Sequence, residues 1–148
     1  MSIFPTKILL ATDGSEEAEL ATTTAVDLAG STGSELHVVS VFPGSAYVHP
    51  YYETHFPEAA ERLRREAHKG RQEMLDERSR QAGGSVTQTH IRAGKAAKEI
   101  VHLAEELDAG LVALGSRGLG GARRALMGSV SDSVVRQAHC PVLVVREA

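Results

Sequence analysis

Short runs of consecutive apolar residues alternate along this chain with longer segments whose apolar residues recur every three or four positions. A continuous apolar run is typical of a strand that is buried on both faces, as in a parallel sheet. A spacing of three and four is typical of an amphipathic helix. Strands that alternate with helices predict an α/β fold: an open parallel sheet with helices on both faces, joined by right-handed crossovers.

The pattern predicts five strands and four helices, in the order β-α-β-α-β-α-β-α-β. The strand over 86–91 alternates only weakly and is expected towards a sheet edge. Residues 44–57 show no clean period and are interpreted as a loop. The expected strands span 7–12, 36–42, 86–91, 111–114 and 142–145, and the expected helices span 16–30, 58–81 and 95–107 and a segment after Gly128. On the second helix, the apolar stripe is formed by Ala60, Leu63, Ala67, Gly70 and Met74.

Length and composition limit the function classes. The 148 residues are expected to form one domain over 1–148. One cysteine excludes an intramolecular disulfide, and the net charge of −3 argues against nucleic-acid binding through bulk electrostatics. No apolar run approaches the roughly 20 residues of a membrane helix, and residues 1–6 lack the features of a signal peptide. A cytoplasmic location without membrane insertion is therefore expected.

Glycines are concentrated where a ligand would be expected to bind. Five of the 14 fall between Gly115 and Gly128, after the fourth expected strand and before the last helix. Ligands of open parallel sheets bind at the carboxyl ends of the strands, and glycines let backbone N–H groups approach an anion. Ser129 is expected to cap the helix and to donate its hydroxyl to a phosphate, and Arg117, Arg123 and Arg124 would add positive charge.

The alternative is that these glycines only form tight turns and that Ser129 is an ordinary cap. The position of the loop between a strand and a helix argues against this alternative, as does the lack of carboxylate partners for the arginines within the loop. Better-known nucleotide signatures are absent: the only Gly-Lys pair, Gly94-Lys95, is followed by Ala96, and the first strand ends in Asp13-Gly14-Ser15 rather than G-x-G-x-x-G.

The spacing Gly115-x2-Gly118-x9-Gly128-Ser129, with a first strand that ends in residues 11–15, resembles the universal stress protein family in its ATP-binding branch. The resemblance extends from Lys7 to Arg146. It implies a Rossmann-like fold that binds ATP, with Mg²⁺ on the phosphates, and a homodimer formed through the C-terminal strand, Val142 to Val145.

The resemblance also implies a set of nucleotide-binding residues. The resemblance implies that the end of the first strand borders the adenosine, with Asp13 near the ribose or the metal. It also implies that the backbone of Val41 recognises adenine. Two departures from the family pattern, Ala11 for proline and Ser40 for histidine, affect the adenine side. The implied set is Ala11, Thr12, Asp13, Val41, Leu114, Gly115, Ser116, Arg117, Gly118, Gly128, Ser129 and Val130, with Asp13 as the metal ligand.

Two other groups of residues could have a function. The seven histidines lack the His-x3-His spacing of a helical metal site and are interpreted as surface or packing residues. Five of the six aromatic residues lie between Phe42 and Phe56. They could form a lid over the nucleotide, a surface for a partner, or a cluster that packs on the long helix.

The preferred function is that of a dimeric ATP-binding stress-response protein whose nucleotide state is read by an unknown protein partner. Neither a general base nor a positioned nucleophile for fast hydrolysis is evident. An enzyme that slowly hydrolyses ATP or phosphorylates itself, using Asp13 and Ser129, remains an alternative. A structural dimer with a vestigial, empty site is a third.

Overall fold

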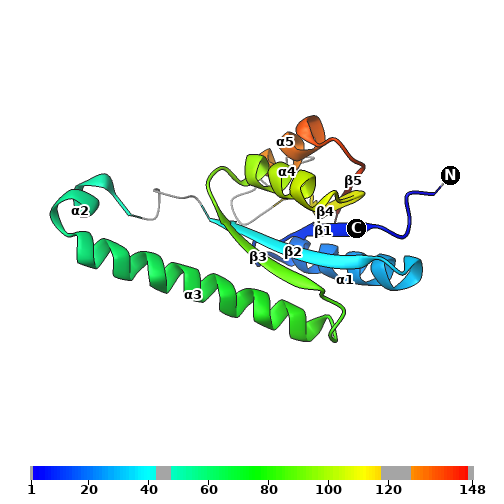
Figure 1. Cartoon of the computed structure of the whole chain (residues 1–148), viewed down its shortest axis with the longest axis horizontal. Coiled ribbons are helices and arrows are strands. Elements are labelled where there is room, and N and C mark those ends of the chain that lie inside the picture. The colour runs from blue at the N-terminus through cyan, green and yellow to red at the C-terminus, as the bar shows by residue number, and fades with distance from the viewer. Residues whose placement is uncertain (1, 43–47, 118–127, 147–148) are drawn as a thin grey trace.

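The structure is a computed structural model that describes residues 2–42, 48–117 and 128–146. Strands and helices alternate as the sequence predicts, with one additional short helix (Figure 1). The strands are β1 Lys7–Ala11, β2 Glu35–Phe42, β3 Gln88–Ala93, β4 Leu111–Gly115 and β5 Val142–Val145. The helices are α1 Glu16–Thr32, α2 Pro50–His55, α3 Pro57–Gln81, α4 Ala96–Leu107 and α5 Ser129–Gln137.

The five strands form one sheet in the order β3-β2-β1-β4-β5, and every neighbouring pair is parallel. The predicted parallel α/β fold is therefore confirmed. The chain builds outward from β1 to β3 and then returns to β4 on the other side of β1. The strand order thus reverses between β1 and β4, and this is where ligands of such sheets bind.

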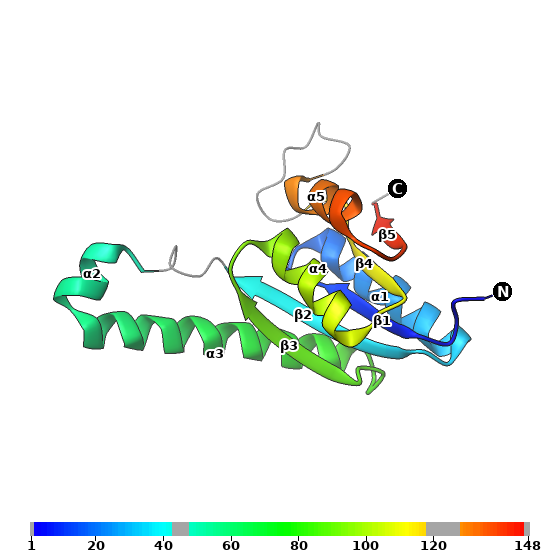
Figure 2. The same cartoon turned by 45° about the horizontal axis from the view of Figure 1, so that its top comes forward.

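Helices cover both faces of the sheet (Figure 2). On one face, α1 and the C-terminal part of α3 pack against Ile8, Leu10 and Val38, with Ala21 and Leu75 among the fully buried helix residues. The other face is covered by α4 and α5. Its core contains Leu9, Val39, Ile100, Leu103, Val112 and Val134. Burial on both faces explains why the central strands are continuous apolar runs.

The first helix is longer than the sequence predicts. It runs to Thr32, and Gly30 lies within it rather than at its end. Gly33 ends the helix in the left-handed conformation, at φ 70°, and donates its N–H to the carbonyl of Ala29. A glycine after the last turn is a common helix terminator because it has no Cβ to clash in this conformation.

The segment interpreted as a loop over residues 44–57 contains a helix, α2, so that interpretation was wrong for Pro50–His55. Pro50 occupies the first turn, where its missing N–H costs no hydrogen bond, and the His49 ring accepts the N–H of Tyr51 at 3.1 Å. A six-residue helix without buried side chains leaves no apolar period in the sequence. Residues 43–47 lie outside the described part of the chain.

The predicted stripe on the long helix does not pack as a whole. Only the C-terminal part of α3 lies under the sheet, and its N-terminal part projects beyond the sheet together with α2 (Figure 1). Leu63 is accordingly 48% exposed, whereas Leu75 is fully buried. We call α2 and residues 57–66 of α3 the arm.

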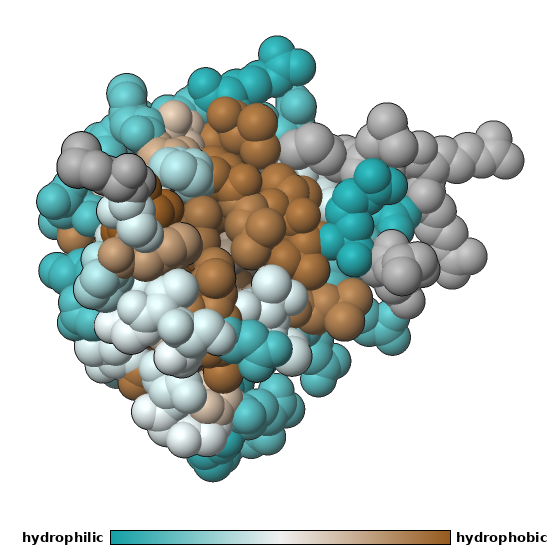
Figure 3. Space-filling view, turned by 90° about the vertical axis from the view of Figure 1, so that its right-hand side faces the viewer, coloured by the Kyte–Doolittle hydropathy of each residue, from teal (hydrophilic) through white to brown (hydrophobic). Residues whose placement is uncertain are grey.

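The strand β3 lies at an edge of the sheet, as predicted, and the C-terminal strand β5 lies at the opposite edge. The side chains of β5 are all half-buried. Figure 3 views the side of the molecule that carries β5 and shows a continuous apolar area there. Within the described residues, none of the helices is both long enough and apolar enough to cross a bilayer.

Candidate functional site at the carboxyl edge of the sheet

The turn between β1 and α1 forms as the sequence predicts. The Ser15 N–H donates to Oδ1 of Asp13 at 2.9 Å, and Ser15 Oγ accepts the N–H of Ala18 at 3.2 Å, which caps α1. Gly14 adopts φ 85°, a conformation that L side chains rarely adopt. Thr12 is buried, and its N–H donates to the Val39 carbonyl at 3.0 Å. These contacts fix the backbone of the predicted residues 11–13 at the strand end.

The end of β4 lies directly against the first turn of α1. A Cβ on Gly115 would stand 3.0 Å from the carbonyl carbon and from the Cβ of Glu17, a tighter contact than side chains normally make, so this approach favours glycine. The next residue, Ser116, is 1% exposed, and its N–H donates to the Val145 carbonyl at 2.8 Å. Leu114, also a predicted site residue, has its side chain buried in the core between the sheet and α4–α5.

Glu17, which no pattern in the sequence indicates, organises this edge. Its carboxylate accepts hydrogen bonds from Ser116 Oγ, from the Arg117 N–H at 2.7 Å and from Arg117 Nη2 at 3.1 Å. Burial by itself would raise the pKa of Glu17, but the hydrogen bonds from Ser116 and Arg117 outweigh it and hold the pKa below 4.5. Glu17 is therefore an anion that joins α1 to the end of β4.

The ion pair with Glu17 corrects one expectation about the arginines. The Arg117 guanidinium has a carboxylate partner after all, contributed by a residue 100 positions earlier in the chain. Because Glu17 lies outside the loop, no pattern within the loop indicates this pair. Gly118, Arg123 and Arg124, the other predicted members of the loop, lie outside the described residues.

The start of α5 is tied to the same strand end. Ser131 Oγ donates to the Ser116 carbonyl at 2.6 Å, and the Gly128 N–H donates to that carbonyl as well. The N-cap is Gly128, not Ser129 as predicted, and it offers no side-chain cap. Ser129 is instead the first helical residue, and its side chain is exposed. Free N–H groups at a helix N-terminus favour an anion in front of them.

The end of β2 borders this edge on the other side of β1. Because Ala11 pairs in register with Val39, Val41 lies two residues beyond the last paired position of β1. The neighbouring Ser40 is fully buried, and its Oγ accepts a hydrogen bond from Arg71 Nη1 at 2.9 Å. The structure thus brings the described candidates from β1, β2, β4 and α5 to one edge of the sheet.

This edge has features that fit a phosphate ligand. The N-terminus of α5 has no side-chain cap, so its first backbone N–H groups are accessible to an anion. The described residues contain no group of three or more His, Cys, Asp or Glu side chains able to hold a metal. Mg²⁺ is commonly held by one or two carboxylates together with phosphate oxygens, and Asp13 provides one carboxylate at this edge, with its Oδ1 accepting the Ser15 N–H.

Comparisons with known proteins assign the fold and sequence to a family. The model of the "Universal stress protein family" matches residues 5–146. The chain belongs to the universal stress protein family. A protein of Staphylococcus haemolyticus provisionally named a universal stress protein is 37% identical over 142 residues, which is 94% of this chain and 83% of that protein.

Solved universal stress proteins have the same architecture. The UspA protein of Lactobacillus plantarum superposes with a TM-score of 0.82 at 28% identity, covering 98% of this chain and 100% of that one. A universal stress protein solved in complex with cAMP superposes with a TM-score of 0.66 at 24% identity, covering 99% of this chain and 100% of the other. These likenesses support the α/β fold described above.

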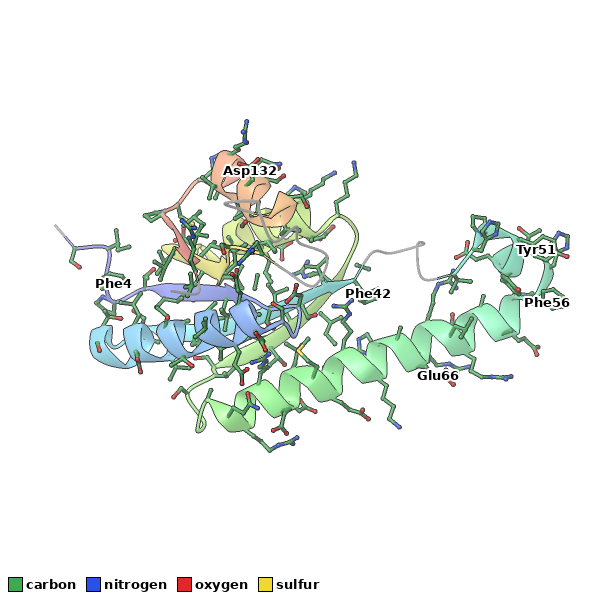
Figure 4. All side chains as sticks on the ribbon, turned by 180° about the vertical axis from the view of Figure 1, so that it is seen from behind. Phe4, Phe42, Tyr51, Phe56, Glu66 and Asp132 are labelled. Carbon is green, nitrogen blue, oxygen red and sulfur yellow. The ribbon has the colours of Figure 1, made fainter. Side chains whose placement is uncertain are left out.

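The aromatic cluster of this universal stress protein lies away from the sheet edge. Tyr51, Tyr52, His55 and Phe56 pack on one another around the junction of α2 and α3, with ring centroids 4.4–6.3 Å apart. Figure 4 shows Tyr51 and Phe56 at the far end of the arm, well beyond Phe42. In this conformation the cluster does not cover the ends of β1 and β4, and Tyr51 is 54% exposed.

Two of the histidines that the sequence left scattered form a pair. His37 on β2 and His90 on β3 stack with ring centroids 5.4 Å apart, and Nδ1 of His37 lies 3.1 Å from Nε2 of His90. Burial lowers the pKa of both rings, and their mutual repulsion lowers the pKa of His90 further. Cross-strand pairing brings together two residues that are 53 positions apart, a relation that no local pattern indicates.

Proposed function

We propose that this universal stress protein binds ATP at the carboxyl edge of its sheet, as a regulatory module rather than a fast enzyme. The observation that carries the proposal is the uncapped N-terminus of α5, which Ser131 and Gly128 hold beside the end of β4. A helix start fixed in this way presents N–H groups and a positive dipole end without any reorganisation. These groups would bind the phosphates.

The remaining roles follow the order of the strands across the edge. The end of β1 would border the ribose, with Asp13 near a Mg²⁺ ion that the phosphates carry. The backbone of Val41 would recognise adenine from the end of β2. We assign the phosphate contacts to Gly118, Gly128, Ser129 and Val130, and Ala11 and Thr12 would border the adenosine. Leu114, Gly115 and Ser116 would form the strand end beside the ribose and phosphates, because the N–H and carbonyl of Ser116 are already engaged by Val145, Ser131 and Gly128. Bound Mg²⁺ would supply positive charge to the phosphates.

Arg117 receives a different role from the one the sequence favoured. Because Glu17 engages both its guanidinium and its backbone N–H, Arg117 would position the strand end rather than contact the phosphates through its free charge. The electrostatic attraction for the nucleotide would then come mainly from backbone N–H groups. The fold neighbour solved in complex with cAMP supports the choice of an adenine nucleotide over other phosphate esters.

Slow hydrolysis or self-phosphorylation is the second candidate, because the Ser129 side chain is exposed at the helix start and could accept a phosphoryl group. The nearby carboxylate of Glu17 is a poor general base, since its pKa is held low by Ser116 and Arg117. Turnover of the unmodified protein, compared with Asp13→Ala, separates the two functions. A pure binder shows no Asp13-dependent rate.

The protein is further proposed to act in the cytoplasm as a homodimer whose nucleotide state is read by an unknown protein partner. Support for the dimer comes from β5, an apolar edge strand whose unpaired side could join that of a second copy. The direct test of the bound ligand is mass analysis of the small molecules that co-purify with the untreated protein. ATP or another adenine nucleotide is expected; a preparation that never retains one, even after incubation with ATP, contradicts the proposal.

A further inference from the structure

A groove of about 590 Å³ runs between α4 and α5. Both helices begin at the carboxyl edge of the sheet and lie side by side on the same face (Figure 2). The α4 wall carries Lys95, Lys98 and His102, and the α5 wall carries Ser129, Ser133 and Gln137. One wall is therefore basic, and the other offers hydroxyl and amide groups.

The lysines of this groove and the acidic residues of the two helices are not joined in ion pairs within the described part of the chain. Neither lysine forms an ion pair with a described residue. The acidic residues have partners elsewhere: Asp132 pairs with Arg136 at 3.0 Å, Glu106 with Arg92 at 2.7 Å, and Glu105 with His139 at 3.1 Å. The remaining carboxylate of α4, that of Glu99, lies against Gly94.

The backbone adds to the same charge. Both helices start at the groove, α4 after Lys95 and α5 after Gly128, and neither start has a side-chain cap. Two helix N-termini and two lysines thus give the groove a positive field, with Ser129 and Ser133 as hydrogen-bond donors. An anion with several oxygens along its length matches this arrangement better than a single carboxylate does.

We propose that the groove between α4 and α5 binds a chain of condensed phosphate groups, held by Lys95 and Lys98 on one side and by Ser129 and Ser133 on the other. Ser129 also belongs to the proposed nucleotide site, so the chain has two possible sources. It is either the phosphate tail of a nucleotide seated at the sheet edge or a free inorganic polyphosphate. Only the first source rests on the proposed function.

The test compares the unmodified protein with Lys95→Gln/Lys98→Gln in calorimetric titrations with sodium tripolyphosphate, ATP and AMP. The control is Arg65→Gln/Lys69→Gln, which removes the same charge from exposed positions on α3. We expect the groove variant to bind tripolyphosphate or ATP about three- to tenfold more weakly than the unmodified protein at low salt, which is the combined effect of two exposed charges. The control variant should keep its affinity. AMP has no phosphate chain, so the unmodified protein and the groove variant should bind it with equal affinity.

The outcomes separate this proposal from the nucleotide site. If replacing the two lysines weakens ATP binding, the result supports the nucleotide tail as the source. If it weakens tripolyphosphate binding, the result supports a free polyphosphate chain, even if AMP and ATP fail to bind. If neither ATP nor tripolyphosphate binding depends on the two lysines, the groove proposal is overturned, while AMP binding would still uphold the nucleotide site. Equal losses in the control variant would also overturn it, because they would reflect net charge alone.

Discussion

The carboxylate of Glu17, in the first turn of α1, lies 3.1 Å from Nη2 of Arg117, beyond the end of β4. The same carboxylate accepts the backbone N–H of Arg117 and the hydroxyl of Ser116. An arginine that the sequence suggests as a phosphate ligand is thus part of the support for the site. Glu17, on α1, therefore holds the backbone at the end of β4 in position.

Replacing Glu17 by glutamine should destabilise the fold by about 1–3 kcal/mol, since a buried charged acceptor is lost while Arg117 keeps its charge. Urea unfolding at pH 7 measures the change. Because the pKa of Glu17 is lowered in the folded state, its contribution is present above pH 4.5 and is lost as the pH falls through the folded value. The difference between the two proteins should therefore narrow in acid.

The exposed neighbour Glu16 provides the matched control. Glu16→Gln should change stability by no more than about 0.5 kcal/mol, as surface substitutions usually do. Equal effects of the two substitutions would mean that the contacts of Glu17 contribute nothing to stability.

Gly115 and Gly30 should respond to alanine with opposite signs. At Gly115 the new Cβ would meet the Glu17 backbone at 3.0 Å, so we expect a loss of about 1–3 kcal/mol from overpacking. At Gly30, inside α1, nothing lies within 4 Å and helix propensity should raise stability by about 0.5–1 kcal/mol. Thermal unfolding of both variants measures this; a stable Gly115→Ala protein would refute the close approach.

The fold could be predicted from the sequence because strands buried on both faces appear locally as continuous apolar runs. Runs such as residues 8–10 are apolar throughout, and the turn at Asp13-Gly14-Ser15 carries its own capping chemistry. The partners of the site were less visible. Glu17 and Arg117 are 100 residues apart, and Ser131 reaches Ser116 only because the start of α5 lies beside the end of β4. Such contacts depend on tertiary structure, and no spacing within one segment indicates them.

The His37–His90 pair should make stability fall in mild acid. Burial lowers the pKa of both rings in the folded state, so the unfolded chain takes up protons first, near pH 6.5. Stability should therefore decrease as the pH drops below about 6.5 and level off once the folded rings are protonated. Urea unfolding between pH 8 and 5 measures this. His90→Gln should flatten the profile, whereas the exposed His68→Gln should leave it unchanged.

The proposed dimer predicts that sedimentation at micromolar concentration gives the mass of two chains. Hydrogen exchange locates the contact: some amides of β5 should exchange faster on dilution, whereas those of β3, at the opposite edge, should not change. A monomer at micromolar concentration would rule out this assembly. If dilution speeds amide exchange only in β3, the dimer interface lies at the β3 edge instead.

Calorimetric titration of nucleotide-stripped protein with ATP tests the central claim most directly. We expect saturable binding of about one ATP per chain, and we expect Gly128→Val to abolish it, since a branched side chain would obstruct the start of α5 while φ −75° leaves the backbone unstrained. Gly118→Val should act likewise. Gly70→Val, on the exposed part of α3, is the matched control and should bind normally. No detectable affinity of the stripped, folded protein for ATP would contradict the account.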